Sequence, residues 1–286
     1  MRSALTTTAQ SRETLAKNYM EDSDFLDLRN IDLDDRKLSE KELVERLSIS
    51  KDGKIHYNLF SNLIYKPVGH DEFSKYKGFY LAFEILRQEI GFEKNNKPGD
   101  FDILIIPYNE NEVFYNRTCA IEVKVVRPRR NNPRKAPNSY GITQIEGLIK
   151  DGFPLVGLLH ICMTEPLEES EKSTIKFDLV PFDIDNPKNN NDFMKNALDV
   201  KFDHFSQFSA ENQMKKLISK DIPKYVGLNT IGVNILKDGS LISWFNYDFN
   251  NGFSSGYFNP YKKTETIEKI KYFFKNSPNK FVDVKK

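Results

Sequence analysis

Cysteine is scarce in this sequence, neither sign of charge is in excess, and long hydrophobic runs are missing. Only Cys119 and Cys162 occur, both within apolar stretches, which excludes the disulfide framework of a small secreted protein and favours two reduced, buried thiols. The formal net charge of +1 excludes a global basic field, so any nucleic-acid contact must come from a local patch. No run is long enough for a membrane-spanning helix, and residues 1–10 lack the apolar core of a signal peptide. We therefore expect a cytoplasmic protein that does not enter a membrane.

A histidine-based metal cluster is also missing. His56, His70, His160 and His204 are far apart in the sequence and show no spacing typical of metal ligands, so each is expected to be a packed or solvated side chain. Hydrophobic residues make up 39% and charged residues 29% of the chain, as in ordinary globular proteins. A chain of 286 residues with this composition can bury the core of one large domain or two modest ones.

Residues 1–70 are polar and rich in charge, and their clearest feature is a helix start. Ser39 can cap this helix while Glu42 reaches back to the cap, and apolar residues follow from Leu43 onward. We interpret residues 1–70 as an N-terminal helical extension without catalytic residues.

Residues 71–165 show the sharpest alternation of elements. Aromatic and apolar residues recur at three- and four-residue spacing over 73–86 and Gly91 follows, a pattern that predicts a helix of about five turns. After it we predict a strand that starts at Asp102 and ends at Pro107, a strand over 119–126, a helix over 143–150 and a strand over 153–163. The order helix, strand, strand, helix, strand predicts an α/β fold, a mixed sheet flanked by helices.

Residues 166–286 have weaker patterns and are predicted to form an α+β region, either separate from the core or continuous with it. Its expected elements are a strand over 176–182, a polar loop over 183–192, a helix capped by Ser209 that ends at Lys220, a hairpin of 231–236 with 241–247, and a helix over 264–275.

Charged side chains are predicted to meet on the two strands that follow Gly91. Side chains alternate across a strand, so Glu122 and Lys124 share one face, and Asp100 and Asp102 likewise share a face of the earlier strand. A hairpin centred in residues 109–116 would place Asp102 opposite a residue near Val123. Two close carboxylates need a cation between them, and oxygen ligands suit Mg²⁺. The residues therefore predict a metal site, although an acidic-x-Lys triplet alone is more often a solvated strand face.

The order of elements around Asp102 and Glu122-Val123-Lys124 resembles the PD-(D/E)xK nuclease superfamily, whose restriction-endonuclease-like core runs helix, β-hairpin, helix, strand. The resemblance covers about residues 72–163. It implies a Mg²⁺-dependent nuclease, with Mn²⁺ able to substitute, in which Asp102, Glu122 and Val123 bind the metal and Lys124 assists the attacking water.

Further roles follow only from this resemblance. Many members carry a glutamate on the first helix and a glutamine on the second, and Glu84 and Gln144 stand at such positions, where they would support metal or substrate. The Pro-Asp pair of the family is not adjacent here, because Pro98 and Gly99 precede Asp100. Either Asp100 or Asp102 can therefore be the ligand, and the apolar run that follows Asp102 favours Asp102.

A basic loop follows the strand that carries Lys124. It contains no acidic residue, and prolines at 128, 133 and 137 keep it extended. As a clamp for a phosphate backbone it would make binding sensitive to salt. The residues expected to bind nucleic acid are Arg127, Arg129, Arg130, Arg134 and Lys135. Tyr140, Trp244, Phe245 and Tyr247 can stack on bases, although packing is the simpler interpretation for them.

These patterns leave several alternatives open. DNA is the expected partner, RNA is not excluded because no base-reading module is present, and a non-catalytic binding or scaffold protein on the same fold is the competing interpretation. The small net charge favours a short substrate footprint or a protein partner that supplies further DNA contacts. A homodimer also remains open.

Overall fold

The computed structural model describes residues 39–40, 43, 76–93, 99–165, 167–178, 197–235, 241–244, 253–254 and 256–285. The chain divides into two compact units. The larger consists of Leu26–Glu165 and Ser206–Lys286, and the smaller of Met1–Phe25 and Pro166–Phe205. The site discussed below lies entirely within the larger unit.

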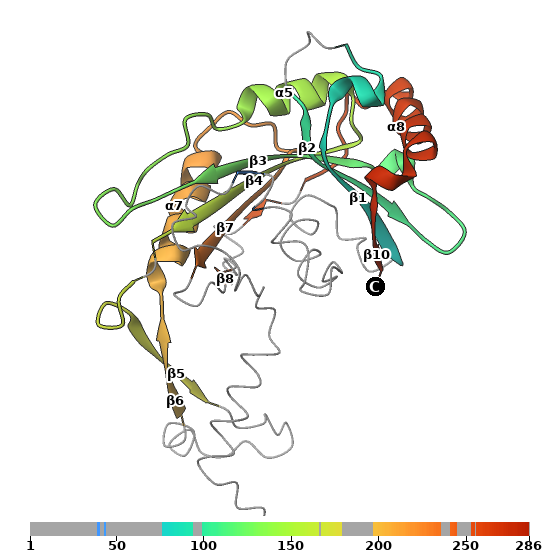
Figure 1. The fold of residues 1–286 in the computed structure, drawn as a ribbon. Coiled ribbons are helices and arrows are strands. Elements are labelled where there is room, and N and C mark those ends of the chain that lie inside the picture. Colours follow the sequence, from blue (N-terminus) through green and yellow to red (C-terminus); the bar gives the residue numbers. More distant parts are fainter. Residues whose placement is uncertain are drawn as a thin grey trace, which may run out of the picture. The chain divides into compact units, whose positions relative to one another are not determined.

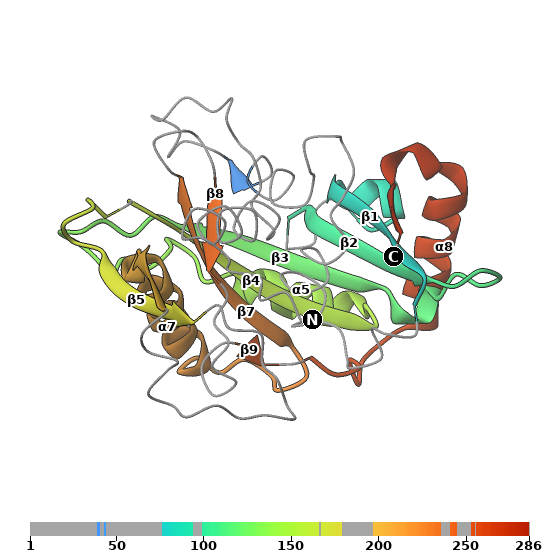
Figure 2. The ribbon, with the colours of Figure 1, turned by 90° about the horizontal axis from the view of Figure 1, so that it is seen from below.

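The larger unit is built on a mixed sheet, which in the described part of the chain has eight strands (Figure 2). Their order is β10-β1-β2-β3-β4-β7-β8, and β9 also pairs with β7. β1, β2, β3 and β10 pair antiparallel, whereas β4 lies parallel to both β3 and β7. The strands are β1 (Gly78–Ile85), β2 (Phe101–Tyr108), β3 (Cys119–Val126), β4 (Leu155–Thr164), β7 (Gly227–Ile235), β8 (Leu241–Trp244), β9 (Phe253–Ser254) and β10 (Val282–Lys285).

Helices cover one face of this sheet (Figure 1). α5 (Ile142–Asp151) and α8 (Thr264–Asn276) pack there through buried residues such as Leu148 and Phe273, and α7 (His204–Ile218) adds Met214. The opposite face carries a second apolar cluster, which includes the fully buried Leu43. Short 3-10 turns η3 (Arg87–Ile90), η4 (Tyr115–Arg117) and η6 (Pro278–Lys280) complete the elements. No helix in the described ranges is both long and apolar enough to cross a membrane.

The smaller unit contains a two-stranded antiparallel ribbon. Its strands are β5 (Ser173–Asp178) and β6 (Ala197–Phe202), so the strand predicted over 176–182 begins three residues earlier. The buried Asp203 follows, and its carboxylate accepts hydrogen bonds from the backbone N–H groups of Leu167 and Phe205 at 2.8 and 3.0 Å. The polar loop predicted over 183–192 lies outside the described residues.

Most predicted elements of the core are confirmed, and the α/β class with them. The strand predicted over 119–126 is β3, the helix predicted over 143–150 is α5, and the strand predicted over 153–163 is β4. The C-terminal helix and the hairpin of β7 and β8 are also present. Because β7 to β10 join the same sheet, the described part of 206–285 is continuous with the core.

The helix predicted before Gly91 is wrong over residues 78–85, which form strand β1. The aromatic spacing that suggested a helix also fits a period of two, in which Phe79 and Leu81 face one side and Tyr80 and Ala82 the other. Aromatic and branched residues favour a strand, and pairing with both β2 and β10 decides the outcome. The core therefore begins with a strand where a helix was expected.

Two boundaries also differ from prediction. Ser209 does not cap α7 but lies buried inside it, because Asp203 caps the helix by accepting from the N–H of Phe205. Pro107 does not end β2 but lies within it, at a point where β3 is no longer paired.

Candidate active site

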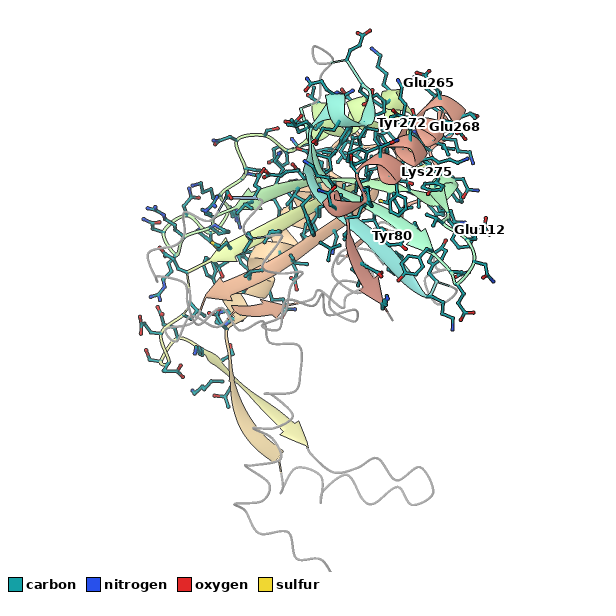
Figure 3. All side chains as sticks on the ribbon, turned by 45° about the vertical axis from the view of Figure 1, so that its right-hand side comes forward. Tyr80, Glu112, Glu265, Glu268, Tyr272 and Lys275 are labelled. Atoms are coloured by element: carbon teal, nitrogen blue, oxygen red, sulfur yellow. The ribbon has the colours of Figure 1, made fainter. Side chains whose placement is uncertain are left out.

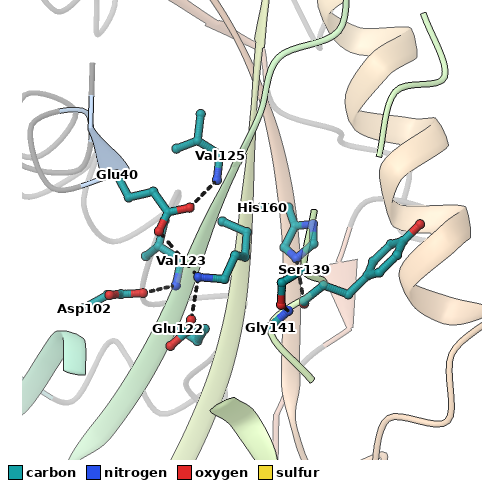
Figure 4. Close-up of polar contacts among 10 residues, drawn as sticks. Glu40, Asp102, Glu122, Val123, Val125, Ser139, Gly141 and His160 are labelled. Carbon is teal, nitrogen blue, oxygen red and sulfur yellow. Dashed lines mark hydrogen bonds and ion pairs between the residues drawn. The ribbon is translucent and has the colours of Figure 1, made fainter. Parts of the chain in front are cut away.

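The site lies where β2 and β3 separate. Their pairing runs through Ile103 and Ile121 and goes no further in this direction. Beyond it the Asp102 carboxylate accepts a hydrogen bond from the N–H of Val123 at 2.6 Å, in the place of a partner strand (Figure 4). Asp102 is thus fixed beside β3, one residue from the register that the hairpin centre predicted. The side chain of Val123 is buried in the cluster on the opposite face, so only its backbone borders the site.

Glu122 and Lys124 project from β3 toward α5. The Lys124 ammonium lies 2.7 Å from a Glu122 carboxylate oxygen, and Glu122 is only 5% exposed. Gly141, just before α5, packs against both side chains with φ of +76°. A Cβ there would lie 2.9 Å from Leu158 and 3.2 Å from Glu122, so only glycine allows this approach.

Glu40 is a site residue that the sequence reasoning missed. One of its carboxylate oxygens accepts from the N–H of Val125 at 3.1 Å, and the other lies 3.4 Å from the Lys124 ammonium (Figure 4). Leu43, whose N–H donates to the Ser39 carbonyl, is buried in the core and anchors this turn. The capping signal at Ser39 located the helix start, but nothing local linked Glu40 to a strand more than 80 residues away.

The predicted side chains line one pocket of about 390 Å³. Every residue expected to be catalytic contributes to it, although β1 rather than a helix carries one of them. The lining residues are Glu84, Leu86, Gly99, Asp100, Asp102, Glu122, Lys124 and Gln144.

Glu84 reaches the pocket from a distorted position of β1. Its φ of +43° is the only positive value outside glycine in the described residues. The β1–β2 register pairs Phe83 with Ile103 and Ile85 with Phe101, so the position opposite Asp102 is left out of the ladder. Such a conformation costs about 1 kcal/mol or more in a residue with a Cβ, and strain of this kind gathers at functional sites.

Gln144 and Asp100 differ in how their polar atoms are used. Gln144 is the third residue of α5, and its side-chain oxygen is buried without a hydrogen-bond partner in the described part of the chain. A ligand or water in the pocket would satisfy it. Asp100 is exposed and accepts from the N–H of Arg87 at 3.2 Å. Asp102 is therefore the better placed of the two aspartates to act with Glu122.

Burial keeps the two carboxyl groups from ionising easily. It raises the pKa of Glu122 to about 7, with the nearby Asp102 charge adding to the shift, and it raises the pKa of Asp102 to about 6. The carboxylates around Lys124 raise its pKa despite burial, so the ammonium stays charged. Near neutral pH the site can therefore hold a proton that a cation would displace.

The two buried carboxyl groups of the pocket would suit Mg²⁺ better than a metal that needs three or four protein ligands. Within the described residues, no group of three or more histidine, cysteine, aspartate or glutamate side chains is arranged around a metal position. Mg²⁺ keeps several waters and is commonly bound by one or two carboxylates. Asp102 and Glu122 would supply these two, and the buried Gln144 oxygen would supply an acceptor for a metal-bound water.

A buried histidine on the neighbouring strand β4 holds the chain segment that borders the site. His160 lies beside Lys124 in the register of β3 and β4 and is fully buried. Gln213 donates to its Nδ1 at 2.9 Å, so Nε2 carries the proton and donates to the Tyr140 carbonyl at 3.2 Å. Burial lowers the pKa of His160 to about 4, so the ring is neutral and fixes the chain just before Gly141.

The basic loop follows β3 directly. Arg129, Arg130 and Arg134 are exposed, and Lys216 of α7 holds the loop by donating to the Arg134 carbonyl at 2.7 Å. The same ammonium lies 3.3 Å from the Lys135 carbonyl. Arg127 is partly buried.

Of the aromatic residues proposed to stack on bases, only Tyr140 has a described side chain. The Lys220 ammonium lies 4.6 Å from its ring centroid, and its ring also stacks on His160. Trp244 is described by its backbone in β8, while Phe245 and Tyr247 lie outside the described residues. Stacking on bases stays a prediction.

Comparison of the chain with protein-family models, with curated proteins and with solved structures found no significant match.

Proposed function

We propose that this protein is a Mg²⁺-dependent nuclease that hydrolyses DNA phosphodiester bonds, and that it is a member of the PD-(D/E)xK superfamily. The observation that carries the proposal is the convergence of Asp102, Glu122 and Lys124 in one pocket, with both carboxyl pKa values raised by burial. The order β2, β3, α5, β4 supports the family resemblance, and β1 departs from it by replacing the first helix.

The residues of the site have separate roles in the proposed reaction. Asp102 and Glu122 would hold Mg²⁺, which when bound would acidify a water and polarise a phosphoryl oxygen. Lys124 orients the attacking water and offsets charge that develops on the phosphate. Its ion pair with Glu122 fixes its direction, and Glu40 holds it from the other side. The exposed arginines beyond β3 bind the phosphate backbone and position the strand.

The test is cleavage of labelled DNA with Mg²⁺ by the wild type, by Lys124→Ala and by Lys275→Ala. Lys275 is an exposed lysine of α8 and serves as the matched control. We expect Lys124→Ala to lose at least about a hundredfold in rate, as when one preorganised donor is removed from a site, and Lys275→Ala to cleave normally. Equal cleavage by both variants would refute the proposed site. A wild type that binds DNA but neither cleaves it nor binds Mg²⁺ would favour a non-catalytic binding protein. Preferential cleavage of RNA would mean that RNA is the substrate.

A further inference from the structure

Residues 256–263, here called the aromatic loop, present aromatic rings and cations to solvent. The loop reads Gly-Tyr-Phe-Asn-Pro-Tyr-Lys-Lys and contains no acidic residue. Tyr257, Phe258 and Tyr261 are 55%, 36% and 65% exposed. A cluster of exposed aromatic side chains is more often an interaction site than an inert part of the surface.

The exposure of these rings is built into the fold. Asn259, in the middle of the loop, is 1% exposed, and its side-chain amide donates to the carbonyls of Ile149 and Phe153 at 3.1 and 3.0 Å. Its side-chain oxygen accepts from the N–H of Tyr261 at 2.9 Å, which closes a turn around Pro260. These hydrogen bonds anchor the loop to the C-terminal end of α5 and fix its backbone so that the aromatic rings stay exposed to solvent.

Two cations lie against one of these rings, that of Phe258. The Lys262 ammonium is 4.7 Å from the Phe258 ring centroid, and the Arg117 guanidinium is 5.5 Å from it. The N–H of Tyr257 donates to the Tyr225 carbonyl at 2.9 Å, which brings a further aromatic residue to the edge of the loop. Rings that stack and cations that neutralise phosphate are the two components of a surface for unpaired nucleotides.

We propose that the aromatic loop binds single-stranded nucleic acid. Tyr257 and Tyr261 stack on bases, while Lys262 and Arg117 contact phosphates. A duplex is a poor ligand for this loop because its bases are already stacked and paired. The charge pattern favours a nucleic acid over an apolar protein partner, because the loop itself contains two lysines and no acidic residue. The neighbouring Glu265 interacts with Lys263 and pairs with Lys269, which leaves Lys262 as the loop cation that faces the rings.

The position of the loop relates it to the proposed active site. The loop is fixed at the C-terminal end of α5, and Gln144, near the N-terminal end, lines the pocket. The ten residues of α5 span about 15 Å, which is the length of four or five stacked nucleotides. A strand held on the aromatic loop would therefore reach the pocket within a few nucleotides. This relation to cleavage rests on the proposed function, whereas binding to the loop does not.

The test uses fluorescence anisotropy of the full chain with labelled oligothymidylate, oligouridylate and a DNA duplex, in EDTA so that no cleavage occurs. The variant is Tyr257→Ala with Tyr261→Ala, and the matched control is Tyr272→Ala. Tyr272 is 71% exposed and lies on the outer side of α8 with Glu268 (Figure 3). We expect the wild type to prefer the single strands, the double variant to bind them about tenfold more weakly or worse, and the control to bind normally.

Unchanged single-strand affinity in the double variant, or a wild type that binds duplex at least as well, would overturn the proposal. Tyr261→Phe keeps the ring and is expected to keep binding even if the double variant folds poorly, so its loss of binding would also count against stacking. The DNA and RNA arms identify which single strand is the ligand. Binding in EDTA needs neither metal nor cleavage, so a failure of the nuclease proposal would leave this result unaffected.

Discussion

The charge of Glu122 should destabilise the metal-free protein, so Glu122→Gln should stabilise it at alkaline pH. An unfolded glutamate ionises near its ordinary pKa of 4.5, whereas burial beside Asp102 raises the pKa of Glu122 to about 7 in the folded state. Between these values the folded state binds more protons than the unfolded state, so stability falls as the pH rises through this window. One pKa unit corresponds to about 1.4 kcal/mol, which gives a cost of about 3 kcal/mol above pH 7.

Urea unfolding at pH 5 and pH 8 in EDTA measures this cost. At pH 5 the folded wild type carries a protonated Glu122, so Glu122→Gln should change the unfolding free energy by less than about 1 kcal/mol. At pH 8 the variant should be more stable by up to about 3 kcal/mol. The control is Glu146→Gln, on an exposed position of α5, which should have no effect at either pH.

One result would refute the reasoning about Glu122, and a second would refute the metal site. Glu122→Gln that is less stable than the wild type at pH 8 would mean that the pair with Lys124 outweighs burial. The metal site is tested separately by adding Mg²⁺ at pH 8. Mg²⁺ should raise the stability of the wild type and not of the variant, because a ligand stabilises only the state that binds it. A wild type that does not respond to Mg²⁺ would argue against the metal site while leaving the pH effect intact.

Three further substitutions test other parts of the site and its support. Glu84→Gly should cleave DNA more slowly, while its free energy of unfolding should equal that of the wild type or exceed it by up to about 1 kcal/mol. Glycine relieves the positive φ at a smaller entropic cost. Cleavage rates and urea unfolding measure the two effects. Arg87→Ala should lose about 3–5 kcal/mol of stability, because Arg87 is 2% exposed and lies 2.7 Å from the largely buried Asp151, whose charge would remain uncompensated. For His160→Gln, the stability deficit relative to the wild type should shrink by about 2 kcal/mol between pH 6.5 and 4.5, because the unfolded histidine takes up a proton before the buried one does.

Each of these outcomes has a clear opposite. A loss of stability in Glu84→Gly would mean that the side chain holds the strand rather than straining it. Removal of Asp151 together with Arg87 should recover part of the stability, and failure to do so would mean that packing of Arg87 on Phe92 and Phe101 matters more than charge. A deficit of His160→Gln that is constant with pH would show that His160 is not held neutral.

The sequence predicted the parts of the site that depend on local pattern. Strand alternation placed Glu122 and Lys124 on one face, and the turn centre placed Asp102 within one residue of its observed position. The predicted helix over the residues of β1 failed because an aromatic run satisfies both periods, and only pairing with β2 and β10 selects the strand. Glu40 and the His160–Gln213 contact were invisible because both join segments far apart in the chain, for which a single sequence carries no periodic signal.

The separation of β2 from β3 gives the central strand two unusual amides. The N–H groups of Val123 and Val125 are bonded to the side chains of Asp102 and Glu40, although β3 lies in the middle of the sheet. Ligands that draw these carboxylates away would leave the two amide protons without their partners. Because Asp102 lines the pocket, hydrogen exchange at Val123 would report occupancy of the pocket directly, in a strand whose amides bonded to other strands exchange only when the sheet opens.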